Sequence, residues 1–408
     1  MQFFATTAKG MEPVLAQELR EIGALNVQET RAGATFEGTL ETAYRACLWS
    51  RIANRILLPL KTFPASNPEK LYGGAKSIRW SDHVSARGTI AVDFSTTHSE
   101  ITHSHYGALK VKDAIVDQLR SVQGERPSVD IKRPDLRVNA YLNADQATVS
   151  IDLSGESLHR RGYRDESVPA PMKENLAGAI LAFANWRKVA DEGGSFIDPM
   201  CGSGTLPIEA ALIAARIAPG LARDYHGFKG WLQHDEELWA RLCDEARDLE
   251  IRDAKKQPMI VGYDRDIQAV RAALAHVERA GLRGRVHIER RDFSELEPVP
   301  PRAALSDGAL QGLVVINPPY GERLGEEEEL KTLYGQIGDT FKKKFQGWEG
   351  YVLTGSPELG KEIGLKPARR IPLFNGAIEC RLFRYELFAG SRVAKPGPST
   401  SPEPASAD

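Results

Sequence analysis

The stretch that decides the fold is SFIDPMCGSGT, residues 195–205, an apolar run that ends in a carboxylate and continues into a glycine turn. The helix-forming segment LPIEAALIAARIA follows at once. Gly202 and Gly204 let the backbone turn sharply and approach a ligand closely, because a Cβ at either position would crowd it. A strand, a glycine turn and a helix in this order predict a crossover unit of an α/β fold. A dinucleotide fingerprint would need a third glycine where Pro207 stands, which disfavours a dehydrogenase.

Helical segments and apolar strands alternate from Glu174 onward, a pattern typical of a parallel sheet with helices on both faces. We predict five strands followed by an antiparallel pair: SFIDPM, MIVGYD, RVHIERRDF, GLVVINPP and GYVLTG, then RRIPLFNG and ECRLFRYELF. The stretch 219–258 separates the first two strands and is expected to be an inserted helical elaboration. The fold class is therefore α/β, with a Rossmann-like seven-stranded domain over residues 166–390.

Three successive strands of the predicted sheet end in acidic residues, Asp198, Asp264 and Asp292. Asp264 can accept hydrogen bonds from both ribose hydroxyls of an adenosyl group. Asp292 can accept one from the adenine amino group while Phe293 packs on the ring. The three strand ends predict a nucleoside cradle, and its expected cofactor-binding residues are Asp198, Pro199, Cys201, Gly202, Gly204, Thr205, Asp264, Asp292, Phe293 and Asn317.

The fourth strand leads into Asn317, Pro318, Pro319 and Tyr320, which we predict to be the catalytic strip. Two prolines in a row end the strand and make the backbone rigid. The amine of a nucleobase is a poor nucleophile, because its lone pair is delocalised into the ring. We expect the Asn317 side-chain oxygen and the Pro318 carbonyl to accept its two N–H bonds, so that the lone pair points at the sulfonium methyl of S-adenosylmethionine. Tyr320 is expected to stack on a base removed from its helix.

Cys201 is the alternative nucleophile, because methylation of cytosine at C5 requires a thiolate. Its place inside the glycine turn favours a packed thiol instead. The four cysteines lie far apart without a C-x-x-C pair, which disfavours a zinc knuckle or a disulfide framework. The histidines of TTHSEITHSHYG also fit no zinc spacing, so we expect no metal.

Two small α+β units precede this domain. Residues 1–60 contain FFATT, the helix EPVLAQELREIGA, ATFEG and the helix ETAYRACLWSRIANRIL. Residues 61–165 contain the strands GTIAVDFST, LRVNAYL and TVSIDL and the helix KVKDAIVDQLRS, and close with the basic turn SLHRRGYR. We call these the N-terminal module (1–60) and the second module (61–165), and we call residues 166–390 the C-terminal module.

The motifs resemble those of the THUMP-domain class I RNA methyltransferases, most closely the bacterial enzymes that make N2-methylguanosine in 23S ribosomal RNA. The resemblance rests on DPMCGSGTLPIEAA, INPPYGERLG, PMKENLAGAIL and VSIDLSGESLHRRGYR. It implies a ferredoxin-like module, then a THUMP RNA-binding domain, then a class I methyltransferase domain. It also implies S-adenosylmethionine as cofactor and RNA as partner, either 23S rRNA or a large-subunit assembly intermediate. A tRNA guanine-N2 methyltransferase and an adenine-N6 RNA methyltransferase stay open as alternatives.

RNA binding must come from local patches, because 53 Lys plus Arg are balanced by 55 Asp plus Glu. Seven cations in or beside the second module are candidates for phosphate contacts: Lys110, Lys112, Lys132, Arg133, Arg160, Arg161 and Arg164.

The ends of the chain carry no predicted chemistry. No targeting segment or spanning helix is visible, so we expect a cytoplasmic protein without membrane contact. The Pro/Ser-rich tail at 391–408 is expected to be disordered. Many relatives continue into a second methyltransferase, and here we expect that activity to be absent or to reside on another protein.

Overall fold

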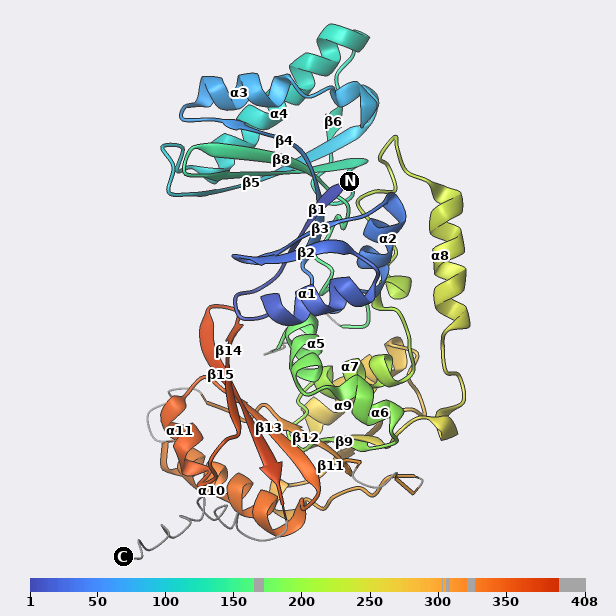
Figure 1. Ribbon diagram of the computed structural model, residues 1–408, viewed down its shortest axis with the longest axis vertical. Coiled ribbons are helices and arrows are strands. Elements are labelled where there is room, and N and C mark those ends of the chain that lie inside the picture. The colour runs from blue at the N-terminus through green and yellow to red at the C-terminus, as the bar shows by residue number, and fades with distance from the viewer. Residues whose placement is uncertain (165–171, 303, 306–308, 321–326, 389–408) are drawn as a thin grey trace, which may run out of the picture.

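The computed structural model describes residues 1–164, 172–302, 304–305, 309–320 and 327–388. These residues form two β-sheets that follow one another along the long axis of the molecule (Figure 1). The expected tail at 391–408 lies outside the described residues.

The first sheet has eight strands in the order β2-β3-β1-β4-β8-β7-β5-β6. Strand β4 pairs with β1 over its first residues and with β8 over the rest, so one continuous sheet runs through both the N-terminal and the second module. The boundary expected at residue 60 lies inside this strand. The strands are β1 (Gln2–Thr6), β2 (Leu25–Thr30), β3 (Gly33–Glu37), β4 (Arg55–Pro64), β5 (Thr89–Thr97), β6 (Ser128–Val129), β7 (Leu136–Asn143) and β8 (Gln146–Asp152).

Four helices pack on this sheet: α1 (Glu12–Glu21), α2 (Leu40–Trp49), α3 (Pro68–Lys76) and α4 (Ser104–Gln123). The helix expected over residues 41–57 is shorter, because α2 ends at Trp49 and the last residues of that segment belong to β4. Ser50 takes extended dihedral angles, and its hydroxyl donates to the Glu18 carboxylate at 2.6 Å, which holds the chain outside the helix. Strand β2 was not predicted, because its side chains are mostly exposed and lack the alternation of a half-buried strand.

The second sheet has the seven strands that the sequence predicts, in the order β11-β10-β9-β12-β13-β15-β14. Strand β15 is antiparallel to both neighbours, and the other pairs are parallel. The strands are β9 (Ser195–Asp198), β10 (Ile260–Asp264), β11 (His287–Arg290), β12 (Gly312–Ile316), β13 (Trp348–Thr354), β14 (Arg369–Asn375) and β15 (Ile378–Leu387).

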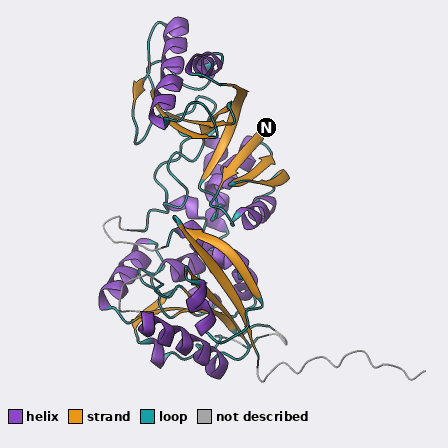
Figure 2. Ribbon diagram, turned by 90° about the vertical axis from the view of Figure 1, so that its left-hand side faces the viewer, coloured by secondary structure: helices purple, strands orange, loops and turns teal. Residues whose placement is uncertain are grey.

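Helices cover both faces of the second sheet (Figure 2). The first face carries α5 (Glu174–Phe183), α6 (Trp186–Asp191), α7 (Thr205–Ala214) and α9 (Ile267–Arg279), and the second carries α10 (Glu327–Lys344) and α11 (Pro357–Glu362). The buried side chains of the first face form one apolar core with those of the two preceding modules, whereas the second face has a core of its own. The N-terminal half of the chain is therefore packed onto the α5–α7 side by apolar contact.

The insertion at 219–258 connects all three modules. Its helix α8 (Glu236–Asp248) runs beside α2, where Arg45 donates to Glu245 at 2.6 Å (Figure 1). Earlier in the insertion, the Tyr225 hydroxyl donates to the Pro134 carbonyl at 2.7 Å, which links the insertion to the second module. Among the described residues, no helix is long and apolar enough to cross a membrane, and no cluster of three or more potential metal ligands occurs.

Candidate active site

A pocket of about 1160 Å³ lies at the carboxyl edge of the second sheet. It collects the turns that follow β9, β10, β11 and β12, which is where an α/β sheet binds its ligand. The structure brings twelve of the predicted cofactor and catalytic residues together in its lining: Asp198, Pro199, Cys201, Gly202, Thr205, Asp264, Asp292, Phe293, Asn317, Pro318, Pro319 and Tyr320.

The two glycines of the turn after β9 have different surroundings. Gly202 has φ 53°, and a Cβ built on it would meet nothing within 4 Å, so its α-carbon faces open space. Its amide donates to the Asp264 carboxylate at 2.9 Å, which joins the first strand end to the second. Gly204 has φ 85°, and its Cβ would lie 3.0 Å from the Cβ of Ala273 in α9. Gly204 does not line the pocket itself, and in the structure it forms the turn and packs on α9, so its cofactor contact stays a prediction.

Burial raises the pKa values of two ionisable side chains at the base of the pocket, Asp198 and Cys201. Asp198 is 2% exposed, and burial raises the pKa of its carboxyl well above the usual range, with the charge of Asp264 adding to the effect. Its Oδ1 accepts from the Met200 amide at 3.1 Å. Burial also raises the pKa of the Cys201 thiol. A thiol that resists ionisation is a weak nucleophile, which supports the interpretation of Cys201 as a packed residue.

The turn after β11 places Asp292 in the pocket wall. Its Oδ1 accepts from the hydroxyl of Ser294 at 2.7 Å and from the amide of the same residue at 3.0 Å, and these bonds hold the pKa of the carboxyl below its usual range. Asp292 is therefore a charged acceptor, as a contact with an amino group requires. Phe293 is 7% exposed, so little of its ring is available for stacking.

The catalytic strip is held from both sides. The Tyr334 hydroxyl of α10 donates to the Pro319 carbonyl at 3.4 Å, and the Asn375 side chain donates to the Tyr320 hydroxyl at 3.0 Å. Asn317 borders the pocket, and its side-chain oxygen is buried without a hydrogen-bond partner among the described residues. Because a buried acceptor without a partner is costly, this oxygen is the group in the pocket that most requires a ligand donor.

Sequence reasoning missed two walls of the pocket. One is helix α10, which contributes Leu333 and Gln336, and the other is the β14–β15 hairpin, which contributes Asn375 and Ile378. Met172, which precedes α5, completes the lining near the N-terminal module. Met172, Leu333 and Gln336 follow no strand end, and Asn375 and Ile378 belong to the terminal hairpin, so their spacing in the sequence carried no signal for a site.

Gly262 supports the pocket from inside β10 and was not singled out by its sequence either. A Cβ at this position would lie 2.7 Å from Ile288, 3.0 Å from Pro207 and 3.1 Å from the Cβ of Cys201. The missing side chain lets the start of α7 pack directly on β10. The signal was present, because a glycine inside an otherwise apolar strand marks a close approach of another segment.

Two of the predicted RNA-binding arginines have internal partners. Arg161 is 1% exposed and forms an ion pair with Glu209, in which Nε lies 3.3 Å from Oε1. The prediction that Arg161 binds RNA is therefore wrong. Arg164 donates to the Met172 carbonyl and to the Thr205 hydroxyl, both at 2.8 Å. It fixes the connection between the second and C-terminal modules beside the pocket.

The other five candidates lie at the surface of the second module or next to it. Lys132 is exposed, and Arg133 is exposed in an ion pair with Asp224. The remaining three also have neighbours: Lys112 with Asp113 at 2.9 Å, Arg160 with Glu156 at 3.9 Å, and Lys110 with the ring of Tyr106 at 5.5 Å. These contacts are exposed or partly exposed, so they leave the five side chains accessible to a phosphate.

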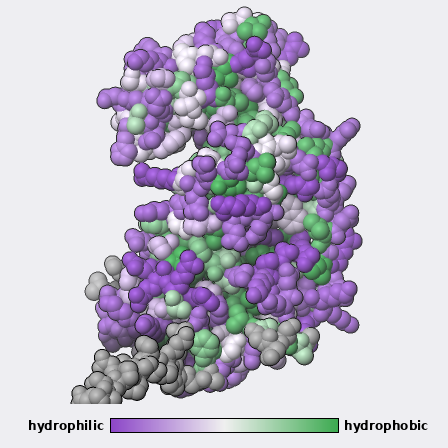
Figure 3. All heavy atoms as spheres, in the orientation of Figure 1, coloured by the Kyte–Doolittle hydropathy of each residue, from purple (hydrophilic) through white to green (hydrophobic). Residues whose placement is uncertain are grey.

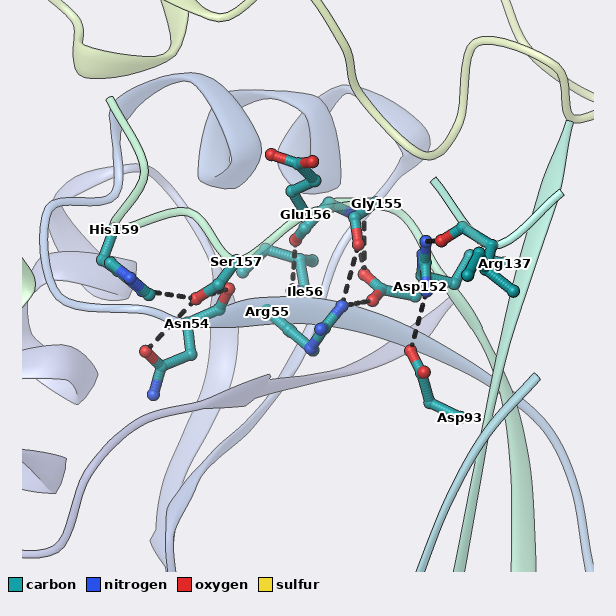
Figure 4. Close-up of polar contacts among 12 residues, drawn as sticks. Asn54, Arg55, Ile56, Asp93, Arg137, Asp152, Gly155, Glu156, Ser157 and His159 are labelled. Atoms are coloured by element: carbon teal, nitrogen blue, oxygen red, sulfur yellow. Dashed lines mark hydrogen bonds and ion pairs between the residues drawn. The ribbon is translucent and has the colours of Figure 1, made fainter. Parts of the chain in front are cut away.

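The joint between the first two modules holds further charged residues in internal contacts (Figure 4). Arg55 pairs with the buried Asp152, and Arg137 lies 3.1 Å from Asp93. The Asp152 carboxylate also accepts from the backbone amide of Gly155 at 3.3 Å, which fixes the turn after β8. These cations therefore stabilise the joint and are not counted among the candidates for RNA contact.

The sheet order and the pocket at the carboxyl edge of the second sheet, together with the family matches, define a class I methyltransferase fold, preceded by a ferredoxin-like module and a THUMP domain. Comparison with protein-family models supports each part: an RMKL-like methyltransferase domain matches residues 161–384, an RlmL ferredoxin-like domain matches 2–57, and a THUMP domain matches 65–152. The chain belongs to the family with the RMKL-like methyltransferase domain.

Several known proteins are similar over most of this chain. The ribosomal RNA large subunit methyltransferases K/L of Syntrophotalea carbinolica and Methylococcus capsulatus are each 52% identical, over 95% and 94% of the chain. The chain spans about half of their length, 54% and 51%. Among solved structures, SMU.472, assigned as a methyltransferase and crystallised with SAH, has a TM-score of 0.83 at 31% identity and covers 96% of this chain and 98% of its own. A predicted N6-adenine-specific DNA methylase from Listeria monocytogenes has a TM-score of 0.81 at 29% identity, over 94% of this chain and 95% of its own.

Proposed function

We propose that this protein is an S-adenosylmethionine-dependent RNA methyltransferase that methylates the N2 amine of a guanine in 23S ribosomal RNA. The observation that carries the proposal is the buried, unpartnered side-chain oxygen of Asn317, in the same pocket as the acidic strand ends. An acceptor held in this way fits one hydrogen of a nucleobase amine.

The pocket fits S-adenosylmethionine in its size and its donor set. Gly202 leaves open space at the turn, and Asp264 and Asp292 offer carboxylate oxygens at successive strand ends. The SAH complex of SMU.472, a protein of the same fold at 31% identity, supports this assignment. We assign cofactor binding to Asp198, Pro199, Cys201, Gly202, Thr205, Asp264, Asp292 and Phe293, and we assign the Asn317 side-chain oxygen to the nucleobase amine.

The chain's own residues act on the amine. Asn317 and the Pro318 carbonyl accept its two N–H bonds and direct the nitrogen lone pair, while Tyr320 stacks on the base. When bound, the cofactor supplies a methyl group on a sulfonium centre. The amine nitrogen forms a bond to the methyl carbon as the carbon–sulfur bond breaks, and the surplus proton leaves to solvent. Positioning replaces a strong base, so no ionised Cys201 or Asp198 is needed.

The N-terminal half supports RNA as the substrate. A THUMP domain is matched at 65–152, and the relatives at 52% identity are named for the large ribosomal subunit. We assign phosphate contacts to Lys110, Lys112, Lys132, Arg133 and Arg160, and module boundaries near residues 60 and 165. A cytoplasmic location follows from this substrate.

An adenine-N6 methyltransferase is the second candidate. The strip can hold any exocyclic amine, and the similar structure from Listeria monocytogenes is that of a predicted N6-adenine-specific DNA methylase, which favours the adenine amine but not RNA. A tRNA guanine substrate would use the same chemistry on another RNA.

The test incubates the full chain and S-adenosylmethionine with unmodified 23S rRNA and with tRNA, and identifies the methylated nucleoside by mass spectrometry. We expect N2-methylguanosine in 23S rRNA. N6-methyladenosine would favour the second candidate. N2-methylguanosine in tRNA alone would identify tRNA as the substrate. The absence of methylated nucleosides in both RNAs would contradict the proposal.

A further inference from the structure

The mouth of the pocket lies close to the N-terminal module. The carboxyl ends of β12 and β13 point toward that module, and the β14–β15 hairpin reaches up to the loop before α1 (Figure 1). The approach is tight, because a Cβ on Gly10 would lie 2.3 Å from the Pro372 carbonyl oxygen. Groups of the N-terminal module therefore border a site whose chemistry belongs to the C-terminal module.

Lys9 is the cation that the N-terminal module presents at this contact. Its ammonium lies 5.2 Å from the centroid of the Phe374 ring, one residue before the pocket residue Asn375. The loop that carries Lys9 is fixed, because the Thr7 hydroxyl donates to the Ile52 carbonyl at 3.0 Å. Lys9 is exposed and has no carboxylate partner among the described residues.

Lys173 is a second exposed cation, and it directly follows the pocket residue Met172 in the chain. Its backbone carbonyl accepts from the amides of Leu176 and Ala177, both at 3.1 Å, so it stands at the fixed start of α5. Two residues later, the Asn175 side chain donates to the Asn54 side chain at 2.9 Å, which ties this helix start to the N-terminal module. Lys173 is exposed, and within the described ranges it also lacks a carboxylate partner.

Several cationic side chains lie near Lys173. His159 has its Nδ1 2.8 Å from the Ser157 hydroxyl (Figure 4). Burial lowers the pKa of His159 to about 3, and the charges of Lys173 and the neighbouring arginines add to this effect. The one carboxylate next to Lys173 in the chain, Glu174, is buried and pairs with Arg164 at 3.3 Å.

Three surface lysines of the C-terminal module contrast with these two. Lys331 pairs with Glu327 and Glu328, Lys344 with Glu297, and Lys361 with Glu358, all at 3.0 Å or less. In the space-filling view, hydrophilic side chains dominate the surface, so a hydrophilic surface is not by itself a signal of binding (Figure 3). The informative features of Lys9 and Lys173 are fixed position, missing carboxylate partners and a place beside the pocket lining in the chain, because Phe374 precedes Asn375 and Lys173 follows Met172.

We propose that Lys9 and Lys173 bind backbone phosphates of the RNA next to the target nucleotide, so that the N-terminal module takes part in substrate binding at the catalytic pocket. The proposal rests on the RNA methyltransferase function proposed above. Lysine ammonium groups suit phosphate oxygens, which position the strand without selecting its sequence. A nucleotide rotated into the pocket would bring its flanking phosphates to the pocket mouth.

The test compares the full chain with the double variant Lys9→Met and Lys173→Met, which keeps the alkyl stems and removes the charges. Binding to in vitro transcribed 23S rRNA is measured over a range of salt concentrations, together with methyl transfer. We expect Kd and KM for RNA to rise roughly tenfold. The slope of log K against log salt should fall by about 1 to 2, while the KM for S-adenosylmethionine stays unchanged.

Lys256→Met is the matched control, because this exposed lysine lies in the insertion and away from the pocket. A double variant with the RNA affinity and salt slope of this control would overturn the proposal. A lower melting temperature with unchanged RNA binding would do so too, because it would make the Lys9–Phe374 contact merely structural. Failure of the wild-type chain to methylate RNA would instead contradict the proposed function, so the two failures are distinguishable.

Discussion

The Asn317 oxygen of the pocket and the Glu209 carboxylate of the connection between the modules are both buried acceptors, but they differ in their partners. In the pocket, the Asn317 oxygen has no partner among the described residues. In the connection, the fully buried Glu209 accepts from Arg161 at 3.3 Å and from Tyr163 at 3.2 Å. Arg51 adds a second cation, whose Nη1 lies 4.0 Å from the same carboxylate and has no hydrogen-bond partner among the described residues. We call Arg51, Arg161, Tyr163 and Glu209 the junction network.

The presence or absence of partners separates a group that can bind a ligand from a group that stabilises the fold. A charge buried with its partners stabilises one arrangement of the chain. A buried acceptor without a partner has an unfavourable free energy, which a hydrogen-bond donor of a ligand can remove. The junction network joins the N-terminal module, the residues after β8 and helix α7. It therefore holds the first two modules at a fixed position relative to the pocket.

The largest expected effect comes from breaking the junction network. Glu209→Gln removes the carboxylate that neutralises Arg161 and Arg51, and should lower the free energy of unfolding by about 3–5 kcal/mol. The measurement is urea unfolding followed by fluorescence. Glu358→Gln, in the exposed pair with Lys361, is the control and should cost at most about 1 kcal/mol. Equal effects of the two changes would show that the network has no special structural role.

Sequence alone predicted the half of the pocket that follows strand ends. Asp198, Asp264 and Asn317 were found because the carboxyl ends of neighbouring parallel strands meet at one edge. The α10 and hairpin walls were missed, because they depend on how distant segments pack. Arg161 was misassigned for the same reason, since a basic turn in the sequence does not reveal that one of its arginines faces Glu209.

The fold, like the pocket, could be predicted from the sequence only in part. The seven strands of the second sheet were predictable from alternating strands and helices, whereas the continuity of the first sheet through β4 was not. Two segments with separate patterns predict two modules, and only the pairing of β4 with both β1 and β8 reveals that they share a sheet.

A smaller effect is expected at the glycine that supports the pocket. Gly262→Ala places a Cβ against Ile288, Pro207 and Cys201, so it should destabilise the fold by about 1–3 kcal/mol and weaken SAH binding. Gly73→Ala is the contrasting control, because this exposed position inside α3 has nothing within 4 Å of the new Cβ. It should stabilise the protein by about 0.5–1 kcal/mol. Thermal unfolding and SAH titration of both variants check this pair, and undiminished SAH affinity in Gly262→Ala would contradict the supporting role.

The effect that is smallest near neutral pH, and that grows as the pH falls, concerns a buried histidine of the insertion. His226 is 3% exposed, and burial lowers its pKa from the ordinary 6.5 to about 3. The neutral ring contributes stability above pH 6.5 that is lost as pH falls from 6.5 toward 3, because the unfolded chain binds the proton first. The contribution of His226 to the slope of the unfolding free energy against pH should approach about 1.4 kcal/mol per pH unit. Urea unfolding at several pH values should give a flatter profile for His226→Gln than for the exposed control His105→Gln, and identical profiles would refute the assignment.

The most direct test of the central claim is methyl transfer by Asn317→Ala, measured beside SAH affinity and thermal unfolding. If the unpartnered oxygen positions the amine, kcat should fall by about 10²–10³-fold, while SAH affinity stays within about twofold and the melting temperature does not fall. Methyl transfer at the wild-type rate by this folded, SAH-binding variant would contradict the account.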